Sequence, residues 1–132
     1  MSLILKVFGL VCVAVGCLHI ALGLGAEQLL GAELSAETLS NASLDSQNRF
    51  YGAQFMLVGA VSWICATDLD RHATLFRVTM VVFFLGGVAR LVSLASHGWP
   101  SEMVQLLGLS ELVIPPLLIV WHAAILKRNA SA

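Results

Sequence analysis

Apolar and polar residues are distributed along the chain in long blocks rather than in short alternation. Four blocks are predominantly apolar and cover residues 3–26, 48–67, 75–95 and 109–126. Each is close to the roughly 20 residues that an α-helix needs to cross a bilayer. Because the bilayer core has no water to satisfy backbone N–H and C=O groups, a helix is expected for each block. The pattern predicts an all-α integral membrane four-helix bundle, folded as a single domain over residues 1–132.

Composition supports a membrane protein and excludes several other classes. Of the 132 residues, 58% are hydrophobic and 11% are charged, and the mean hydropathy is +0.89. Soluble domains carry about 25% charged residues. The formal net charge of -1 gives no sign of nucleic-acid binding, and the three cysteines form no CxxC pair that would indicate a redox motif or a zinc knuckle. The first block is too long for a cleaved signal peptide, so we expect it to remain as an anchor.

Basic residues indicate how the chain is oriented. With four spans, the N-terminus, the connection between the second and third spans and the C-terminus share one side of the membrane. The connections on the other side, residues 27–47 and 96–108, contain no Lys or Arg. The positive-inside rule therefore predicts that both termini are cytoplasmic. The residues that carry this prediction are Lys6, Arg71, Arg77, Lys127 and Arg128.

The longer outer connection, residues 27–47, has leucines at positions 29, 30 and 34 interspersed with acidic residues. This amphipathic pattern predicts a short helix that lies on the outer membrane surface. The run SAETL adds a weak helix-capping signal at Ser35.

A second polar feature lies inside the spans, in the outer third of the membrane, and we call it the polar layer. The segment SLDSQNRFYGAQF, residues 43–55, opens the second span with several polar side chains, and each of the other spans adds one at a similar depth. Ionisable residues within spans normally face the interior of a bundle, because an unpaired charge in lipid is costly. The polar layer consists of His19, Gln47, Asn48, Arg49, Tyr51, Gln54, Arg90 and Glu111.

Spacing and charge suggest how these side chains are arranged. Arg90 and Glu111 come from consecutive helices and form the expected ion pair, while Asp45 or Tyr51 could partner Arg49. Residues 47, 51 and 54 fall on one side of the second span. In the first span, small residues and His19 recur every three or four positions, which suits close helix packing within the bundle or against another chain. Pro115 and Pro116 follow Glu111 by about one turn and can kink the helix or open a pocket.

These observations predict an outward-facing polar pocket formed by residues 43–55 and closed by His19, Arg90 and Glu111. Simpler interpretations stay open beside it. The pair of Arg90 and Glu111 could serve only to fix helix register, Arg49 could extend to the lipid headgroups, and His19 could be a packing residue. No ligand spacing supports a metal or haem site.

Four segments together resemble a known family: GCLHIALG, SLDSQNRFYGAQF, ARLVSL and SELVIPPLL. They are similar to the bacterial membrane family listed only as domain-of-unknown-function family 4345, over nearly the whole chain. The resemblance implies a multi-pass four-helix protein of the bacterial inner membrane and brings no established activity, cofactor or catalytic residue. The general plan is also similar to that of the DoxX-like families, some of which are associated with quinone-linked redox chemistry.

Three classes of function are compatible with these features. The first and favoured one is the binding of a lipid, quinone or other small amphiphile in the polar pocket. The second is a small membrane-embedded enzyme, with His19 or Glu111 as general acid or base and Arg49 or Arg90 holding the substrate. The third is a structural or accessory subunit of a homo-oligomer or of a larger membrane complex. The apolar inner two thirds of the spans offer no polar pathway for a transporter.

Overall fold

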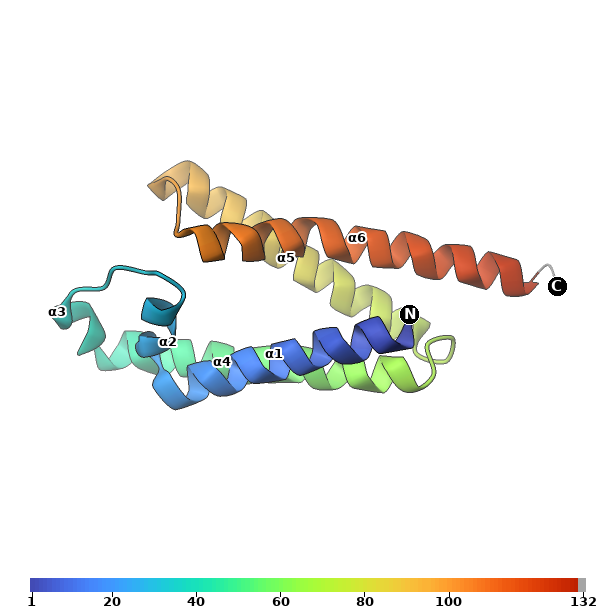
Figure 1. The fold of residues 1–132 in the computed structure, drawn as a ribbon, viewed down its shortest axis with the longest axis horizontal. Coiled ribbons are helices and arrows are strands. Elements are labelled where there is room, and N and C mark those ends of the chain that lie inside the picture. The colour runs from blue at the N-terminus through green and yellow to red at the C-terminus, as the bar shows by residue number, and fades with distance from the viewer. Residues whose placement is uncertain (131–132) are drawn as a thin grey trace.

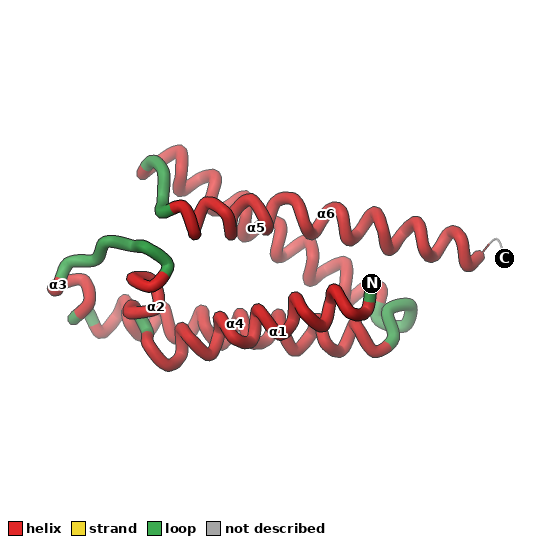
Figure 2. The backbone as a smooth tube through the Cα atoms, viewed as in Figure 1, coloured by secondary structure: helices red, strands yellow, loops and turns green. Residues whose placement is uncertain are grey.

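The computed structural model describes the backbone of residues 1–130, with side chains through Lys127, and within that range the chain is all-α with no strand. Four helices are long and apolar enough to cross a membrane: α1 (Ser2–Leu22), α4 (Ala42–Thr67), α5 (Ala73–His97) and α6 (Glu102–Ala130). Two short helices, α2 (Leu24–Leu29) and α3 (Ala36–Leu39), lie between α1 and α4 (Figures 1 and 2). The prediction of four spanning helices in an all-α chain is confirmed.

The ends of the helices differ from the apolar blocks because caps and turns, rather than hydropathy, set them. α1 ends four residues earlier than expected, since Gly23 has φ of 55° and the chain turns there into α2. α4 begins six residues earlier than expected, because the side chain of Asn41 accepts hydrogen bonds from the backbone N–H groups of Ser43 and Leu44 at 3.1 Å. α6 starts at Glu102 and continues through Pro115 and Pro116.

The four long helices form two antiparallel pairs, α1 with α4 and α5 with α6 (Figure 1). The N-terminus, the connection between α4 and α5 and the C-terminal end of α6 lie together, and we call this the terminus end. α2, α3 and the connection between α5 and α6 lie at the opposite end, which we call the loop end. The two pairs meet at the terminus end, where α5 packs on α4, and are further apart toward the loop end.

Glycines bring α1 and α4 into close contact. A Cβ atom placed on Gly16 would lie 2.5 Å from the carbonyl oxygen of Gly52, and one on Gly59 would lie 2.6 Å from the carbonyl oxygen of Gly9. Backbone therefore packs directly on backbone at two levels, seven residues apart on each helix. The small-residue side of α1 therefore packs on α4 of the same chain. The sequence had left open whether it packs within the bundle or against another chain.

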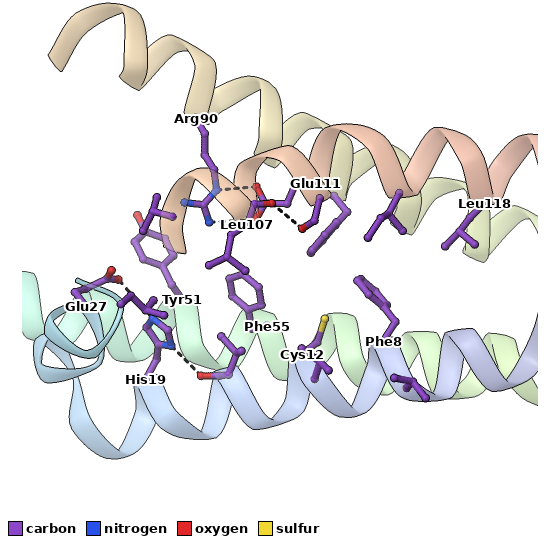
Figure 3. Close-up of a pocket in the computed structure, with 18 of the residues that line it drawn as sticks. Phe8, Cys12, His19, Glu27, Tyr51, Phe55, Arg90, Leu107, Glu111 and Leu118 are labelled. Carbon is purple, nitrogen blue, oxygen red and sulfur yellow. Dashed lines mark hydrogen bonds and ion pairs between the residues drawn. The ribbon is translucent and has the colours of Figure 1, made fainter. Parts of the chain in front are cut away.

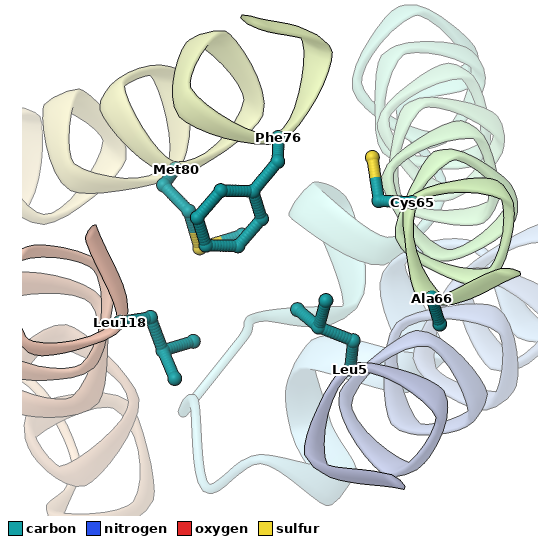
Figure 4. Close-up of a cluster of buried hydrophobic side chains, with 6 residues drawn as sticks. All are labelled: Leu5, Cys65, Ala66, Phe76, Met80 and Leu118. Carbon is teal, nitrogen blue, oxygen red and sulfur yellow. The ribbon is translucent and has the colours of Figure 1, made fainter. Parts of the chain in front are cut away.

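A buried cluster of apolar side chains holds the two pairs together at the terminus end (Figure 4). It joins α1 and α4 to α5 and α6, and its buried members are Leu5, Cys65, Ala66, Phe76, Met80 and Leu118. Many other large apolar side chains on the outer faces of the long helices are exposed. A polypeptide with this surface suits lipid rather than water, so the structure agrees with a multi-pass membrane protein.

The short helices cover the loop end. Ser35 caps α3 by accepting a hydrogen bond from the backbone N–H of Thr38 at 3.1 Å, as the sequence predicts. The amphipathic helix expected after residue 27 instead starts at Leu24 and ends at Leu29. The hydroxyl of Ser101 donates to the carbonyl of Leu30 at 2.6 Å, which ties the end of α2 to the start of α6.

Candidate binding cavity

A cavity of about 510 Å³ lies between the two helix pairs (Figure 3). It runs from α2 near the loop end toward the cluster of Leu5 and Leu118 at the terminus end. Polar side chains line its loop-end portion, and apolar side chains line the rest. The apolar lining includes Ile4, Phe8, Val11, Phe83, Ile114 and Leu118.

The first polar group on the wall is the ion pair of Arg90 and Glu111, which confirms the pairing expected from sequence. Nε of Arg90 donates to Oε2 of Glu111 at 2.7 Å, and Nη2 donates to Oε1 at 3.1 Å. The glutamate side chain is only 6% exposed, while that of the arginine is 37% exposed. Both residues line the cavity, and this two-bond geometry is the strong form of an arginine–carboxylate pair.

Small residues let these two side chains meet. A Cβ atom on Gly108 would lie 3.2 Å from Cδ of Arg90, and one on Gly87 would lie 2.8 Å from Cγ of Leu112. α5 and α6 therefore approach closely on either side of the pair. Pro115 has no N–H group, so the carbonyl of Glu111 receives no helical hydrogen bond from four residues along.

The second polar group consists of His19, Glu27 and Asn48, from α1, α2 and α4. Nδ1 of His19 lies 2.8 Å from the carbonyl of Val15, and because a carbonyl only accepts, this nitrogen carries a proton. The other ring nitrogen, Nε2, faces Oε1 of Glu27 at 3.5 Å. The amide Nδ2 of Asn48 donates to the same carboxylate oxygen at 2.7 Å.

Glu27 is a cavity residue that sequence reasoning missed. Glu27 follows the apolar block that ends at residue 26, so it was expected in a helix on the membrane surface. The turn at Gly23 instead directs α2 back over the cavity, so the carboxylate reaches His19 and Asn48. The run GLGAE, residues 23–27, is a signal for such a turn, because glycine adopts positive φ readily.

Two aromatic side chains of α4 complete the wall between the polar groups. The ring of Phe55 stacks on that of His19, with centroids 6.4 Å apart and planes 9° apart. Tyr51 also lines the cavity, although much of its side chain is exposed. Figure 3 shows Tyr51 and Phe55 on the α4 side of the cavity, opposite the pair of Arg90 and Glu111.

Three residues of the predicted pocket lie outside it. Gln47 and Gln54 are exposed and do not line the cavity, which corrects the expectation that they face inward. The lining residues Asn48 and Phe55 follow them by one position, and one residue turns an α-helix through about 100°. Residues 47, 51 and 54 do share one side of α4, but the cavity faces the neighbouring side, and Tyr51 alone of the three lines it.

Arg49, the third of these residues, fixes a turn. Its Nε donates to Oδ2 of Asp45 at 2.7 Å, and its Nη1 donates to the carbonyls of Ile20 and Ala21 at the end of α1. The backbone N–H of Leu24 donates to Oδ1 of Asp45 at 3.1 Å. Asp45 and Arg49 therefore satisfy free backbone groups on both sides of the Gly23 turn. Of the two partners considered for Arg49, Asp45 is the one found.

The ionisable side chains on the cavity wall carry no surplus of positive charge. Arg90 and Glu111 neutralise each other, and among the described residues Glu27 has one potentially cationic partner within ion-pair distance, His19. Among the described residues, no group of three or more His, Cys, Asp or Glu side chains is placed to hold a metal ion. The chemistry available is hydrogen bonding to a polar group at one end of an otherwise apolar cavity.

Comparison with known proteins gives one match. A family model described as "Domain of unknown function (DUF4345)" matches residues 1–122. No curated protein and no solved structure matches the chain.

Proposed function

Because the chain belongs to the DUF4345 family, whose description assigns no activity, we propose from its cavity that it binds a membrane amphiphile, such as a quinone or a lipid with an uncharged head. The polar head would lie between Arg90 and Glu111 on one side and His19, Glu27 and Asn48 on the other. The tail would extend along α1 toward Leu118. The single observation that carries this proposal is a continuous cavity with polar side chains at one end only.

The dimensions of the cavity suit a chain-bearing ligand. The lining residues of α1 extend from Ile4 to His19, fifteen residues apart, which is about 22 Å along a helix. A volume of 510 Å³ is within the usual range of about 300 to 1,000 Å³ for ligand pockets. A long, narrow apolar space of this kind favours an acyl or isoprenoid tail over a compact polar metabolite.

The cavity also has a side that is open to the surroundings of the bundle. Ile4, Val7 and Val11 of α1 and Ile114 of α6 line the cavity, yet all four are exposed. In a membrane these residues would border lipid, so an amphiphile could enter sideways between α1 and α6 without passing through water. The loop end is covered by α2, which Ser101 holds to α6.

Filling the cavity tests the proposal. Val15 lines the cavity, whereas the neighbouring Ala14 is exposed and does not. We expect native mass spectrometry of gently extracted protein to detect a bound small molecule in the original chain and in Ala14→Trp. Val15→Trp should lose that molecule while keeping its melting temperature. Protein that carries no ligand, or Val15→Trp protein that keeps it, would contradict the proposal.

The charges predict which head group is preferred. Since the polar end has no surplus positive charge, a carboxylate head would meet Glu27 and Glu111 without a free cationic partner. We expect a monoacylglycerol to displace the co-purified molecule at a lower concentration than the fatty acid of the same chain length. A preference for the fatty acid would contradict this assignment of the head group.

A further inference from the structure

The side of α4 that faces away from α1 carries a regular seven-residue pattern. Phe50 lies two positions before Gly52, and Leu57 lies two positions before Gly59, the two glycines that pack on α1. Because two residues turn an α-helix through about 200°, Phe50 and Leu57 lie nearly opposite these glycines on α4. This side therefore points away from α1, although Val61 on it packs against the buried cluster at the terminus end. Its members alternate at spacings of three and four residues, and we call them the α4 seam: Gln47, Phe50, Gln54, Leu57, Val61 and Ile64.

The α4 seam holds polar groups where lipid would surround them. All of its side chains are exposed except that of Val61, which is partly buried. Gln54 lies twelve residues into α4, near the middle of a helix of 26 residues, and its side chain forms no hydrogen bond with any described residue. Gln54 belongs to the polar layer, six residues inside the apolar block that begins at residue 48, and an amide without a hydrogen-bond partner there is costly.

We propose that the α4 seam is the contact surface of a homodimer, in which the α4 helices of two copies lie side by side and parallel. Two copies with the same membrane orientation are related by a twofold axis along the membrane normal, so Gln47 and Gln54 each meet their own counterpart. An amide both donates and accepts, so each glutamine is complementary to itself. The alternation of three and four residues is that of the core positions in a parallel two-stranded coiled coil.

The pattern matches a second copy better than an unrelated helix. Both glutamines occupy equivalent positions, seven residues apart, so one register satisfies both amides at once. Phe50, Leu57 and Ile64, also seven residues apart, occupy the alternate positions of the seam with large apolar side chains. Polar residues at core positions of this kind fix register and the number of strands.

This interface leaves the candidate binding cavity open. The cavity lies on the side of Asn48 and Phe55 and borders the surroundings between α1 and α6. The α4 seam lies on the side of α4 that is turned away from α1. Dimer formation and ligand binding are therefore separate properties, and a variant that loses one should keep the other.

Cysteine cross-linking in native membranes tests the proposal on the full chain. In a background with Cys12, Cys17 and Cys65 changed to alanine, Phe50→Cys and Leu57→Cys should each give a disulfide-linked dimer on oxidation. Both variants retain the two glutamines. Ala60→Cys, off the seam on the same helix, should cross-link more weakly, and Ala89→Cys, exposed on α5, should not cross-link. Equal cross-linking at all four positions, or none, would overturn the proposal, as would cross-links only to a different protein.

Removing the amides gives a second, independent measurement. Energy transfer between labelled copies in bilayers should show that Gln47→Leu/Gln54→Leu dimerises roughly three- to thirty-fold more weakly than the original chain. Gln28→Leu, in the exposed part of α2, should behave like the original chain. An unchanged dimer fraction in the double variant would overturn the role of the amides.

Discussion

At the scale of single residues, the pair of Arg90 and Glu111 has a structural and a site role at the same time. It joins α5 to α6 through two hydrogen bonds, and it lines the cavity. Its two members differ in surroundings, since the glutamate is almost fully buried and the arginine is 37% exposed. The two single substitutions should therefore have unequal effects.

Arg90→Met leaves the Glu111 carboxylate buried without its partner, and we expect this change to lower the free energy of unfolding by about 2–4 kcal/mol. Glu111→Gln leaves an arginine that can extend toward the membrane surface, so its cost should be smaller. Thermal unfolding in detergent measures both, and the double variant should lose less than the sum of the single variants. Strictly additive losses would show that the two side chains do not interact.

The segment of residues 43–55 shows how far sequence reasoning reaches at this scale. Its polarity correctly indicated that the start of α4 meets other parts of the protein, and Asn48 and Tyr51 do line the cavity. Helical spacing alone could not tell which side of α4 faces inward. That choice is made by Gly52 and Gly59, which allow α1 to approach and so turn Gln47 and Gln54 outward.

At the scale of helices, the fold depends on two backbone-to-backbone contacts between α1 and α4. A Cβ atom on Gly52 would lie 2.8 Å from the carbonyl oxygen of Gly16 and 3.0 Å from the backbone nitrogen of Ile20. Backbone atoms cannot move aside as a flexible side chain can, so the helices themselves would have to separate. His19 is carried on the same side of α1, which means that this contact also positions one wall of the cavity.

We predict that Gly52→Ala lowers the free energy of unfolding by about 2 kcal/mol or more and weakens ligand retention. Gly86→Ala is the matched control, because its Cβ atom would meet nothing closer than Oε2 of Glu111 at 3.7 Å and alanine favours a helix. Melting temperatures of the two variants in the same detergent measure the difference. Equal melting temperatures would show that the α1–α4 contact can relax at little cost.

Hydropathy predicted which helices exist but not how they pair or end. The four spans follow from the lengths of the apolar blocks, whereas Gly23, Asn41 and the pair of Asp45 and Arg49 determine where α1 and α4 end and begin. The hydrogen bonds that Asp45 and Arg49 form across the Gly23 turn, with Leu24, Ile20 and Ala21, join residues more than twenty positions apart. They have no periodic signal, so the glycines of residues 23–27 indicate a turn in the sequence but not that this turn brings Glu27 over the cavity.

At the scale of the whole molecule, charge is distributed in a way that supports one orientation in the membrane. Near the terminus end, Lys6 lies in α1 and Arg77 lies in α5, while Arg71 lies in the connection between α4 and α5. Lys127 is near the C-terminal end of α6, and the side chain of Arg128 lies outside the described residues. The two basic residues nearer the loop end, Arg49 and Arg90, are each paired with a carboxylate, so neither adds net charge there.

We therefore predict that the terminus end is cytoplasmic, which in a bacterium places the protein in the inner membrane with the polar end of the cavity in the half of the bilayer away from the cytoplasm. In the cysteine-free background, Ala36→Cys in α3 should react with a membrane-impermeant maleimide in intact spheroplasts. Asp70→Cys, exposed in the connection between α4 and α5, should react only after the membrane is permeabilised. The cysteine-free chain supplies the blank, and permeabilised samples should label at both positions. The reverse pattern would place the polar end of the cavity on the cytoplasmic side, and the exposed lining residues Ile4, Val7 and Val11 would then border the outer leaflet.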